Sequence, residues 1–267
     1  MSTEVTKPEP TLIQSLAVQR RVLHALMLRE VITRFGRDNL GVLWLIGEPM
    51  IFTLGVAGVW SAARLMHISA IPIVAFAVTG YSSVLMWRNA ASHCCSAVEG
   101  NKQLLFHRNV KVLDTLLTRI TLEVGGASAS FMALSLFFIF IGWMPAPIDL
   151  LEVIFGWIML AWFGASLALL MGAATAVSPI VERLWQPVSY LLFPMSGAAF
   201  MVDWMPARLQ QFVLLLPMVH GVEILREGYF GNIVRTHYDI AYMAICCLVL
   251  SLAGLQMVRE VSRRIEL

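Results

Sequence analysis

The sequence predicts an all-α membrane protein with six transmembrane helices. Hydrophobic residues make up 58% of its 267 residues, whereas charged residues make up 13%. The charged residues gather in short stretches between apolar runs that are long enough to cross a bilayer. The net charge of +2 carries little information here, because the placement of Lys and Arg decides how such a chain sits in the membrane.

Residues 1–37 are predicted to form a cytoplasmic amino-terminal region. The first ten residues are polar and contain no hydrophobic core of a cleaved signal peptide. Between residues 11 and 35, apolar residues such as Leu16 and Leu23 stand opposite basic residues such as Arg20 and Arg21 at helical spacing. We therefore expect an amphipathic interfacial helix along the headgroups, with an ordinary cytosolic amphipathic helix as the alternative.

Residues 38–267 are predicted to form the six-helix transmembrane domain. Each apolar stretch can cross roughly 30 Å of hydrocarbon at about 1.5 Å per residue. The stretches cover residues 42–61, 71–88, 118–143, 151–177, 184–202 and 238–258. The first contains Glu48 and Pro49, a carboxylate and a helix breaker that are costly at membrane depth. We interpret Glu48 as a cap on a kink at Pro49, with direct substrate contact as the alternative.

The distribution of basic residues predicts that both termini are cytoplasmic. Of the 19 Lys and Arg residues, only Arg64, Arg208, Arg226 and Arg235 fall on predicted outer segments. Tryptophans near the predicted span ends are interpreted mainly as interface anchors, and stacking on sugar rings is the alternative. These tryptophans are Trp44, Trp60, Trp87, Trp143, Trp185 and Trp204.

The inner loop from residue 90 to 118 is too long for a simple connection between neighbouring helices. It is predicted to hold a short helix, a break near Gly100 and Asn101, and a basic segment that leads into the third span. Two interpretations stay open: a solvated loop held by headgroups, or a docking element for a cytoplasmic partner.

The outer segment from residue 203 to 237 is predicted to contain a re-entrant or interfacial helical hairpin between the fifth and sixth spans. Residues 206–216 are apolar but too few to cross the bilayer, and Pro217 interrupts the run. In the second piece, His220, Glu223 and Arg226 or Glu227 recur at spacings of three to four residues that place them on one helical face. Glu223 and Arg226 either neutralise each other at headgroup level or act at the exit of a substrate path.

Several chemistries have no support in the sequence. The chain has no G-x-x-x-x-G-K-[ST] motif, so it lacks its own nucleotide site and is not expected to be an enzyme. It has no H-E-x-x-H metal motif, and no metal, cofactor or nucleic-acid partner is expected. An intramembrane serine protease using Ser196 with His220 or His237 is a weak alternative, because the expected glycine is replaced by Pro194. In the third span, Glu123 is expected to pair with Arg119 one turn away.

Three motifs resemble one known family. The segment LREVITRFGRDNLGVLWLIGEP resembles the amino-terminal signature of the ABC-2 type export permeases. FHRNVKVLDTLLTRITLE is similar to the loop that enters the third span of the KpsM-like capsular polysaccharide permeases, and LPMVHGVEILREGYFG to their outer helix. The motifs occur in the expected order, and the resemblance extends from about Leu12 to Arg264.

The resemblance implies a permease of the bacterial inner membrane that exports lipid-linked acidic capsular polysaccharide. It implies a homodimer with two cytoplasmic ATPase subunits, which bind the ATP and Mg²⁺, and with a periplasmic adaptor and an outer-membrane exporter. Export of O-antigen or teichoic acid is the alternative within the same superfamily.

The resemblance also implies roles for particular residues. The candidate contacts to the ATPase are Glu99, Lys102, Arg108, Glu182 and Arg183. The first and fifth spans would line the channel, with candidate path residues Arg34, Arg37, Trp44, Glu48, Pro49, Ser196, Gly197 and Ala198. Pro49, Pro187 and Pro194 would be the points at which these spans kink. Arg34 and Arg37 could attract an anionic lipid end, although holding headgroups is the favoured interpretation.

Overall fold

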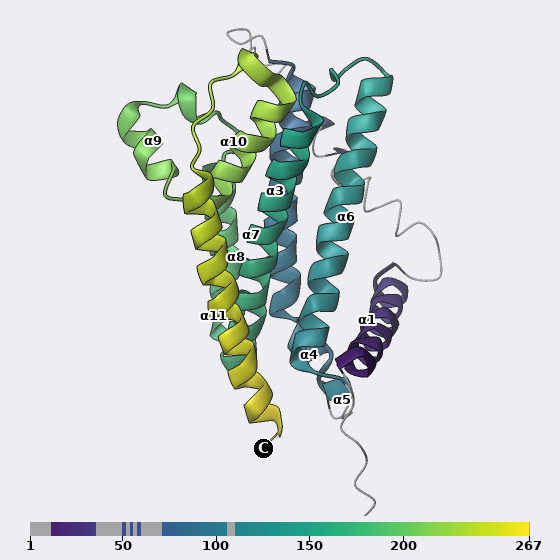
Figure 1. Cartoon of the computed structure of the whole chain (residues 1–267). Helices are drawn as coiled ribbons and strands as arrows, with labels where there is room; N and C mark the ends of the chain where they lie inside the picture. Colours follow the sequence, from purple (N-terminus) through teal and green to yellow (C-terminus); the bar gives the residue numbers. More distant parts are fainter. Residues whose placement is uncertain are drawn as a thin grey trace, which may run out of the picture.

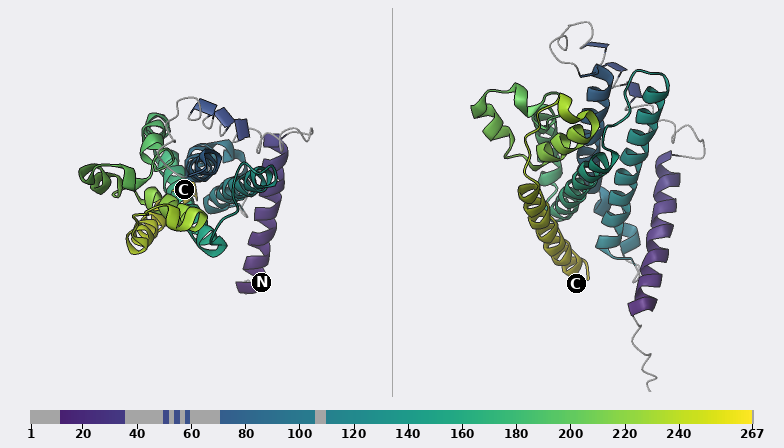
Figure 2. Two further views of the ribbon diagram at one scale, coloured as in Figure 1. Left: turned by 90° about the horizontal axis from the view of Figure 1, so that it is seen from above. Right: turned by 45° about the horizontal axis from the view of Figure 1, so that its top comes forward.

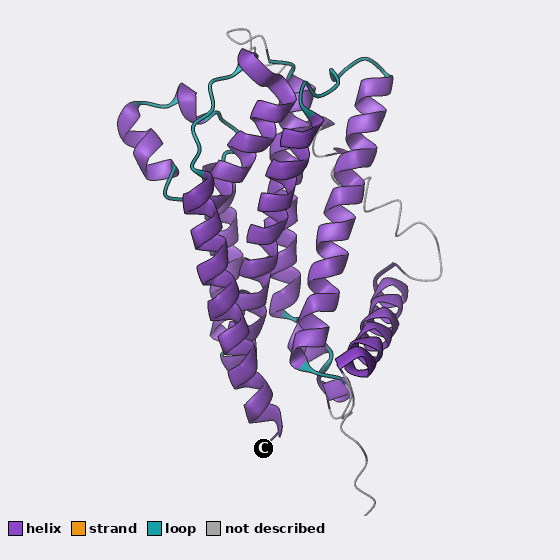
Figure 3. Cartoon of the chain, in the orientation of Figure 1, coloured by secondary structure: helices purple, strands orange, loops and turns teal. Residues whose placement is uncertain are grey.

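The structure is a computed structural model that describes residues 12–35, 50–51, 54–55, 58–59, 71–105 and 110–266. All regular secondary structure in these ranges is helical, which confirms the predicted all-α fold for the described part of the chain (Figure 3). Three described helices are long and apolar enough to cross a membrane: α6 (Val112–Phe140), α7 (Leu150–Val177) and α11 (Ile240–Glu266).

The remaining helices are shorter or more polar. They are α1 (Leu12–Phe35), α3 (Ile73–Cys95), α4 (Ala97–Gly100), α5 (Lys102–Leu105), α8 (Ile180–Met195), α9 (Ala207–Val213) and α10 (Pro217–Phe230), with 3-10 turns η1 (Val202–Trp204) and η2 (Gly231–Ile233). The helices α3 and α8 correspond to the second and fifth predicted spans. Most of the first predicted span, 42–61, lies outside the described residues.

The helix α7 lies at the centre of the bundle and packs against α3, α10 and α11 (Figures 1 and 2). Its approach to α10 brings the two backbones together. A Cβ at Gly156 would lie 2.6 Å from the backbone nitrogen of Leu225, and one at Gly228 would lie 2.6 Å from that of Val153. Since no real Cβ fits at such distances, glycine on both helices is what allows this contact.

Local sequence signals fix several helix ends. The Asp149 carboxylate accepts hydrogen bonds from the backbone nitrogens of Leu151 at 2.9 Å and Glu152 at 3.1 Å, so it caps the amino terminus of α7. Pro217 is the first residue of α10, where its missing N–H costs nothing and its fixed φ favours the helix. The predicted interruption at Pro217 is therefore a helix start.

The helix α3 ends at Cys95 rather than at the predicted residue 88. The polar residues that suggested a membrane exit instead face neighbouring helices. The Arg88 guanidinium carbon lies 4.3 Å from the centroid of the Tyr190 ring, and the Ser92 hydroxyl accepts a hydrogen bond from Trp185 Nε1 at 2.9 Å. Interhelical contacts of this kind allow a polar stretch to continue inside the bundle.

The helix α8 ends at Met195, earlier than the predicted residue 202. Ser196 is its capping residue, and the chain then turns at Gly197, whose φ is +83°. Glycine adopts this left-handed conformation without the steric cost that other residues have. Pro187 and Pro194, the predicted kink points, both lie inside α8.

The interpretation as interface anchors is wrong for two of the tryptophans. Trp87 and Trp185 are buried, and their rings meet edge to face with centroids 6.5 Å apart. They are core residues between α3 and α8. Trp143 and Trp204 are exposed, as interface anchors would be, whereas Trp44 and Trp60 lie outside the described residues.

The two unusual loops contain short helices, and most of the predicted basic segment of the inner loop lies outside the described residues. The inner loop holds α4, a break at Asn101 and then α5. The outer segment forms two short helices, α9 and α10, and Figure 1 shows both at the opposite end of the bundle from α4 and α5. We refer to these as the α4–α5 end and the α9–α10 end.

Candidate functional site

A groove of about 360 Å³ opens at the α4–α5 end. Glu99 and Lys102 form part of its wall, and Val177 at the end of α7 and Val261 and Arg264 near the end of α11 form another part. Two of the predicted ATPase contacts, Glu99 and Lys102, therefore border a surface built from three separate parts of the chain. An apolar depression with charged residues around it suits the docking of a protein partner.

The charged residues of this groove are weakly held. Lys102 Nζ lies 3.7 Å from Glu99 Oε1, and their side chains are 66% and 82% exposed. A water-exposed ion pair of this kind contributes little stability, so both groups can exchange their partner at low cost. Glu182 and Arg183 lie in the first turn of α8, which follows α7 at the same end of the bundle (Figure 1). Arg108 lies outside the described residues.

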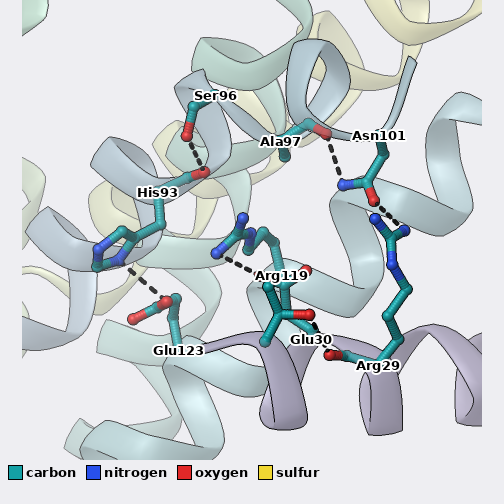
Figure 4. A network of polar contacts seen from close by, with 9 residues as sticks. Arg29, Glu30, His93, Ser96, Ala97, Asn101, Arg119 and Glu123 are labelled. Atoms are coloured by element: carbon teal, nitrogen blue, oxygen red, sulfur yellow. Dashed lines mark hydrogen bonds and ion pairs between the residues drawn. The ribbon is translucent and has the colours of Figure 1, made fainter. Parts of the chain in front are cut away.

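Asn101 joins the α4–α5 loop to α1. Its side chain is buried, donates a hydrogen bond from Nδ2 to the Ala97 carbonyl at 2.8 Å and accepts one at Oδ1 from Arg29 Nη1 at 2.9 Å (Figure 4). The predicted break at Asn101 is therefore held in place, because both the nitrogen and the oxygen of its side-chain amide have a hydrogen-bond partner.

Further polar contacts hold α1 against α6. Arg119 Nη1 lies 2.7 Å from Glu30 Oε1, with side chains only 17% and 15% exposed (Figure 4). This corrects the expected partner of Arg119, since Glu123 instead lies 3.0 Å from His93 Nδ1 on α3. The predicted i, i+4 pairing gives way to contacts between helices because α1 and α3 both pack beside α6.

The predicted path residues of the first span fall outside the part of the chain that the structure describes. Arg34 lies in the last turn of α1, and its side chain is outside the described part of the structure. Arg37, Trp44, Glu48 and Pro49 also lie outside the described residues. Their assignment to a substrate path therefore stays a prediction.

The predicted path residues after α8 lie inside the protein. Ser196, Gly197 and Ala198 are all buried in the turn that follows the helix. This turn packs against α3 so closely that a Cβ at Gly80 would lie 2.3 Å from the Ala198 carbonyl oxygen. In this conformation the turn is part of the core of the α9–α10 end.

Arg226 of α10 holds this turn in place. Its side chain is fully buried, Nη1 donates hydrogen bonds to the carbonyls of Gly197 at 2.7 Å and Phe200 at 2.6 Å, and Nη2 donates to that of Ala198 at 2.7 Å. The guanidinium carbon lies 3.7 Å from the centroid of the Phe76 ring. Burial lowers the pKa of Arg226 to about 9, which leaves it protonated at neutral pH. A cation placed on carbonyls at a helix carboxyl end is favourable.

Glu223 connects the same turn to the start of α11. It accepts hydrogen bonds at Oε1 from the Val202 backbone nitrogen at 3.3 Å and at Oε2 from that of His237 at 3.0 Å. Within the described residues no direct ion pair joins Glu223 to Arg226, although each charge favours the ionised form of the other. Burial raises the pKa of Glu223, and Arg226 and the two N–H groups oppose this shift.

His220 makes a third link at the α9–α10 end. Its Nδ1 accepts a hydrogen bond from the Asp239 backbone nitrogen at 2.8 Å, and its Nε2 lies 2.8 Å from the Leu214 carbonyl. Because a backbone N–H can only donate, Nδ1 is unprotonated and Nε2 carries the proton. Burial lowers the pKa of His220, which favours this neutral form.

This geometry gives no support to a serine protease. The Ser196 hydroxyl donates to the Phe193 carbonyl at 2.6 Å. Both nitrogens of His220 are engaged elsewhere, and His237 Nε2 lies 3.2 Å from Asp203 Oδ1. A serine becomes a nucleophile only with a positioned base, and neither histidine has that role in the structure.

Sequence reasoning missed the residues that complete these contacts. Phe76 and Gly80 lie against Arg226, and Glu30 belongs to the contact between α1 and α6. The only available signal was the placement of polar or small residues in otherwise apolar helices. That signal identifies a position as unusual without naming its partner.

The long apolar helices of the bundle, with a charged groove at one end and buried polar contacts at the other, are those of a helical membrane protein. The model of the ABC-2 type transporter family matches residues 21–230. The chain belongs to the ABC-2 type transporter family.

Named relatives cover almost the whole chain. It is 40% identical over 254 residues to the capsule polysaccharide export inner-membrane protein CtrC of Neisseria meningitidis serogroup A, which covers 95% of this chain and 96% of that protein. It is 41% identical to the capsule polysaccharide export inner-membrane protein BexB of Haemophilus influenzae, with 97% of each chain covered. It is 26% identical to the polysialic acid transport protein KpsM of Escherichia coli, with 91% and 94% covered.

Proposed function

We propose that the protein is the transmembrane permease subunit of an ABC exporter that moves lipid-linked capsular polysaccharide across the bacterial inner membrane. The observation that carries the proposal is similarity at about 40% identity, over nearly the full length, to proteins named for capsule polysaccharide export. A sequence match over nearly the full length supports a shared function more strongly than a likeness of fold alone does.

The proposed energy source is a separate pair of ATPase subunits that bind ATP and Mg²⁺. The sequence has no P-loop of its own, and the family is one of ABC transport proteins. The groove beside Glu99 and Lys102 supports the α4–α5 end as the docking site of the ATPase. The close packing of α4 against α6 and α7 offers a route by which a push on the groove reaches the apolar helices.

The proposed membrane arrangement has six spans, with both termini in the cytoplasm. The helices α3, α6, α7, α8 and α11 would be five of the six, and the first would lie within residues 42–61. The helices α9 and α10 would form the re-entrant or interfacial hairpin on the periplasmic side, packed against protein as backbone within a membrane must be. The permease would act as a homodimer and deliver its substrate to a periplasmic adaptor and an outer-membrane exporter.

Deletion of the gene in a capsule-producing host tests the proposal. We expect polysaccharide to accumulate inside the deletion strain and to return to the surface when the wild-type gene is restored. The affinity-tagged protein should also co-purify with a P-loop ATPase. Normal surface capsule in the deletion strain would contradict the proposed function.

A further inference from the structure

We propose that Arg88 and Tyr190 form a binding subsite for an anionic glycan, at about the middle of the membrane and beside α8. This inference deepens the proposed function and rests on it. It adds residues for which the sequence motifs gave no role, and it names the chemistry they recognise: a carboxylate or phosphate group together with the face of a sugar ring.

The depth of Arg88 follows from the packing of its neighbour. A Cβ at Gly164 would lie 3.0 Å from the Cα of Trp87, and Gly164 stands near the middle of α7. Farther along α7, a Cβ at Gly172 would lie 2.9 Å from the Cys94 carbonyl, near the end of α3. Since α7 is long and apolar enough to cross a membrane, Arg88 lies at the depth of the bilayer interior.

Arg88 has no acidic partner among the described residues. Its guanidinium carbon lies 4.3 Å from the centroid of the Tyr190 ring, and its side chain is half-buried. By contrast, Arg119 has a carboxylate and Arg226 has three carbonyls. One cation–π contact to an exposed ring is worth less than the cost of an arginine in hydrocarbon, so the part of Arg88 that the described residues leave uncovered needs water or a polar group beside it.

The surface of α8 around Tyr190 separates into two stripes. Only Trp185 and Ser189 of α8 are buried. Gln186 and Tyr190 are exposed one turn apart, and Tyr190 contacts Arg88 of α3, whereas Leu184, Val188 and Leu191 are exposed apolar residues that helical spacing places on another side of α8. Lipid or a second subunit suits the apolar stripe, and a hydrated path suits the polar one.

The two side chains together match an acidic polysaccharide. The guanidinium offers several N–H donors that match a carboxylate or phosphate in a bidentate arrangement. The Tyr190 ring is 63% exposed and presents an aromatic face on which an apolar sugar face can stack. A single such subsite would bind each repeat unit of the polysaccharide weakly, which suits a polymer that has to move along the substrate path.

Site-specific photocrosslinking tests this subsite in intact capsule-producing cells. The photoreactive residue p-benzoylphenylalanine replaces Tyr190 in the full-length protein, with Val249 on the exposed side of α11 as the matched control position. We expect irradiation to attach the cell's own polysaccharide, detected with serum against the capsule, at position 190 and not at position 249. An adduct only to lipid or to a second subunit, or equal glycan adducts at both positions, would overturn the proposal.

Substitution of Arg88 separates ligand binding from a packing role. We expect Arg88→Gln to lower the glycan adduct at position 190 and the surface capsule about tenfold, and Arg88→Lys to retain much of both because it keeps the charge. Membrane abundance and ATPase co-purification are measured in each variant. Unchanged crosslinking in a well-assembled Arg88→Gln protein would overturn the proposal. If that variant does not assemble, the comparison of glycan adducts at positions 190 and 249 in the protein with Arg88 intact still tests the proposal. Normal surface capsule in the gene-deletion strain would instead refute the proposed function.

Discussion

The two ends of the bundle use charged residues in opposite ways. At the α9–α10 end, Arg226 is fully buried and its two terminal nitrogens donate to three backbone carbonyls. At the α4–α5 end, Glu99 and Lys102 form an exposed ion pair at 3.7 Å beside an open groove. Charged residues therefore maintain the structure at one end and remain accessible at the other.

This difference follows from the cost of burying charge. A buried guanidinium requires hydrogen-bond partners for its N–H groups, so its neighbours are fixed with it. An exposed pair is hydrated and gains little from its own contact, so it can be exchanged for contacts with a second protein. We expect substitutions at the first end to act on stability and those at the second to act on partner binding.

Arg226→Met should have the largest effect on stability. It leaves three buried carbonyls without their donor and removes the ring contact with Phe76, so we expect a loss of about 3–5 kcal/mol or failure to accumulate. Thermal unfolding of the purified protein in detergent measures the change. Arg208→Met, at an exposed position of α9, is the matched control and should be nearly neutral. Equal stability of the two variants would mean that Arg226 does not hold the turn.

Gly228→Val should have the next largest effect. The new side chain would begin 2.6 Å from the Val153 backbone nitrogen and force α7 and α10 apart, with an expected cost of about 1–3 kcal/mol or more. The same unfolding assay applies. A methyl group added at Gly125 would have no neighbouring atom within 4 Å, so Gly125→Ala is a suitable control and should not destabilise the protein.

A smaller effect is expected from the protonation of His220. Burial lowers the pKa of His220 in the folded protein, so the unfolded chain binds a proton more readily. Stability is therefore fully present above the ordinary pKa of about 6.5 and is lost as the pH falls below it. Unfolding temperatures at pH 7.5 and 5.5 should show a smaller acid-induced decrease in His220→Gln than in the wild type. Burial raises the pKa of Glu223, so this residue favours the folded protein as the pH falls, which is the opposite of the effect of His220. Its contribution is present in both the wild type and His220→Gln.

Charge reversal at the groove should have the smallest effect on stability. Lys102→Glu removes an exposed pair, so we expect a change below about 0.5 kcal/mol. The same variant should strongly reduce co-purification of the ATPase, because the new charge faces the docking surface. Arg20→Glu, at an exposed position of α1, is the control for general charge effects. Intact ATPase binding by Lys102→Glu would remove this residue from the interface.

The helices that could be predicted from the sequence are those whose apolar runs are long. α6, α7 and α11 follow directly from hydropathy, and the short helices α4, α9 and α10 follow from breaks at Asn101 and Pro217. The prediction failed at Arg88, which suggested the end of a span although α3 continues past it. A single arginine does not reveal whether headgroups, a ring or a ligand surround it.

The partners of the buried polar residues could not be predicted. Arg226 binds carbonyls of a turn 26 to 29 residues earlier in the chain, and Arg119 binds Glu30 rather than its neighbour Glu123. These contacts depend on how the helices pack, which local periodicity does not determine. The family, in contrast, was predictable because its three motifs are specific, and the match to residues 21–230 confirms it.

Hydrogen–deuterium exchange of the nucleotide-free permease, alone and bound to its ATPase, tests the contrast between the two ends most directly. We expect residues 97–105 to gain protection when the ATPase binds, because the groove is the docking surface. Residues 197–202 should be protected already and unchanged, because Arg226 and Glu223 hold that turn in the permease itself. Rapid exchange at residues 197–202 in the permease alone, together with no change at residues 97–105, would contradict the assignment of both ends.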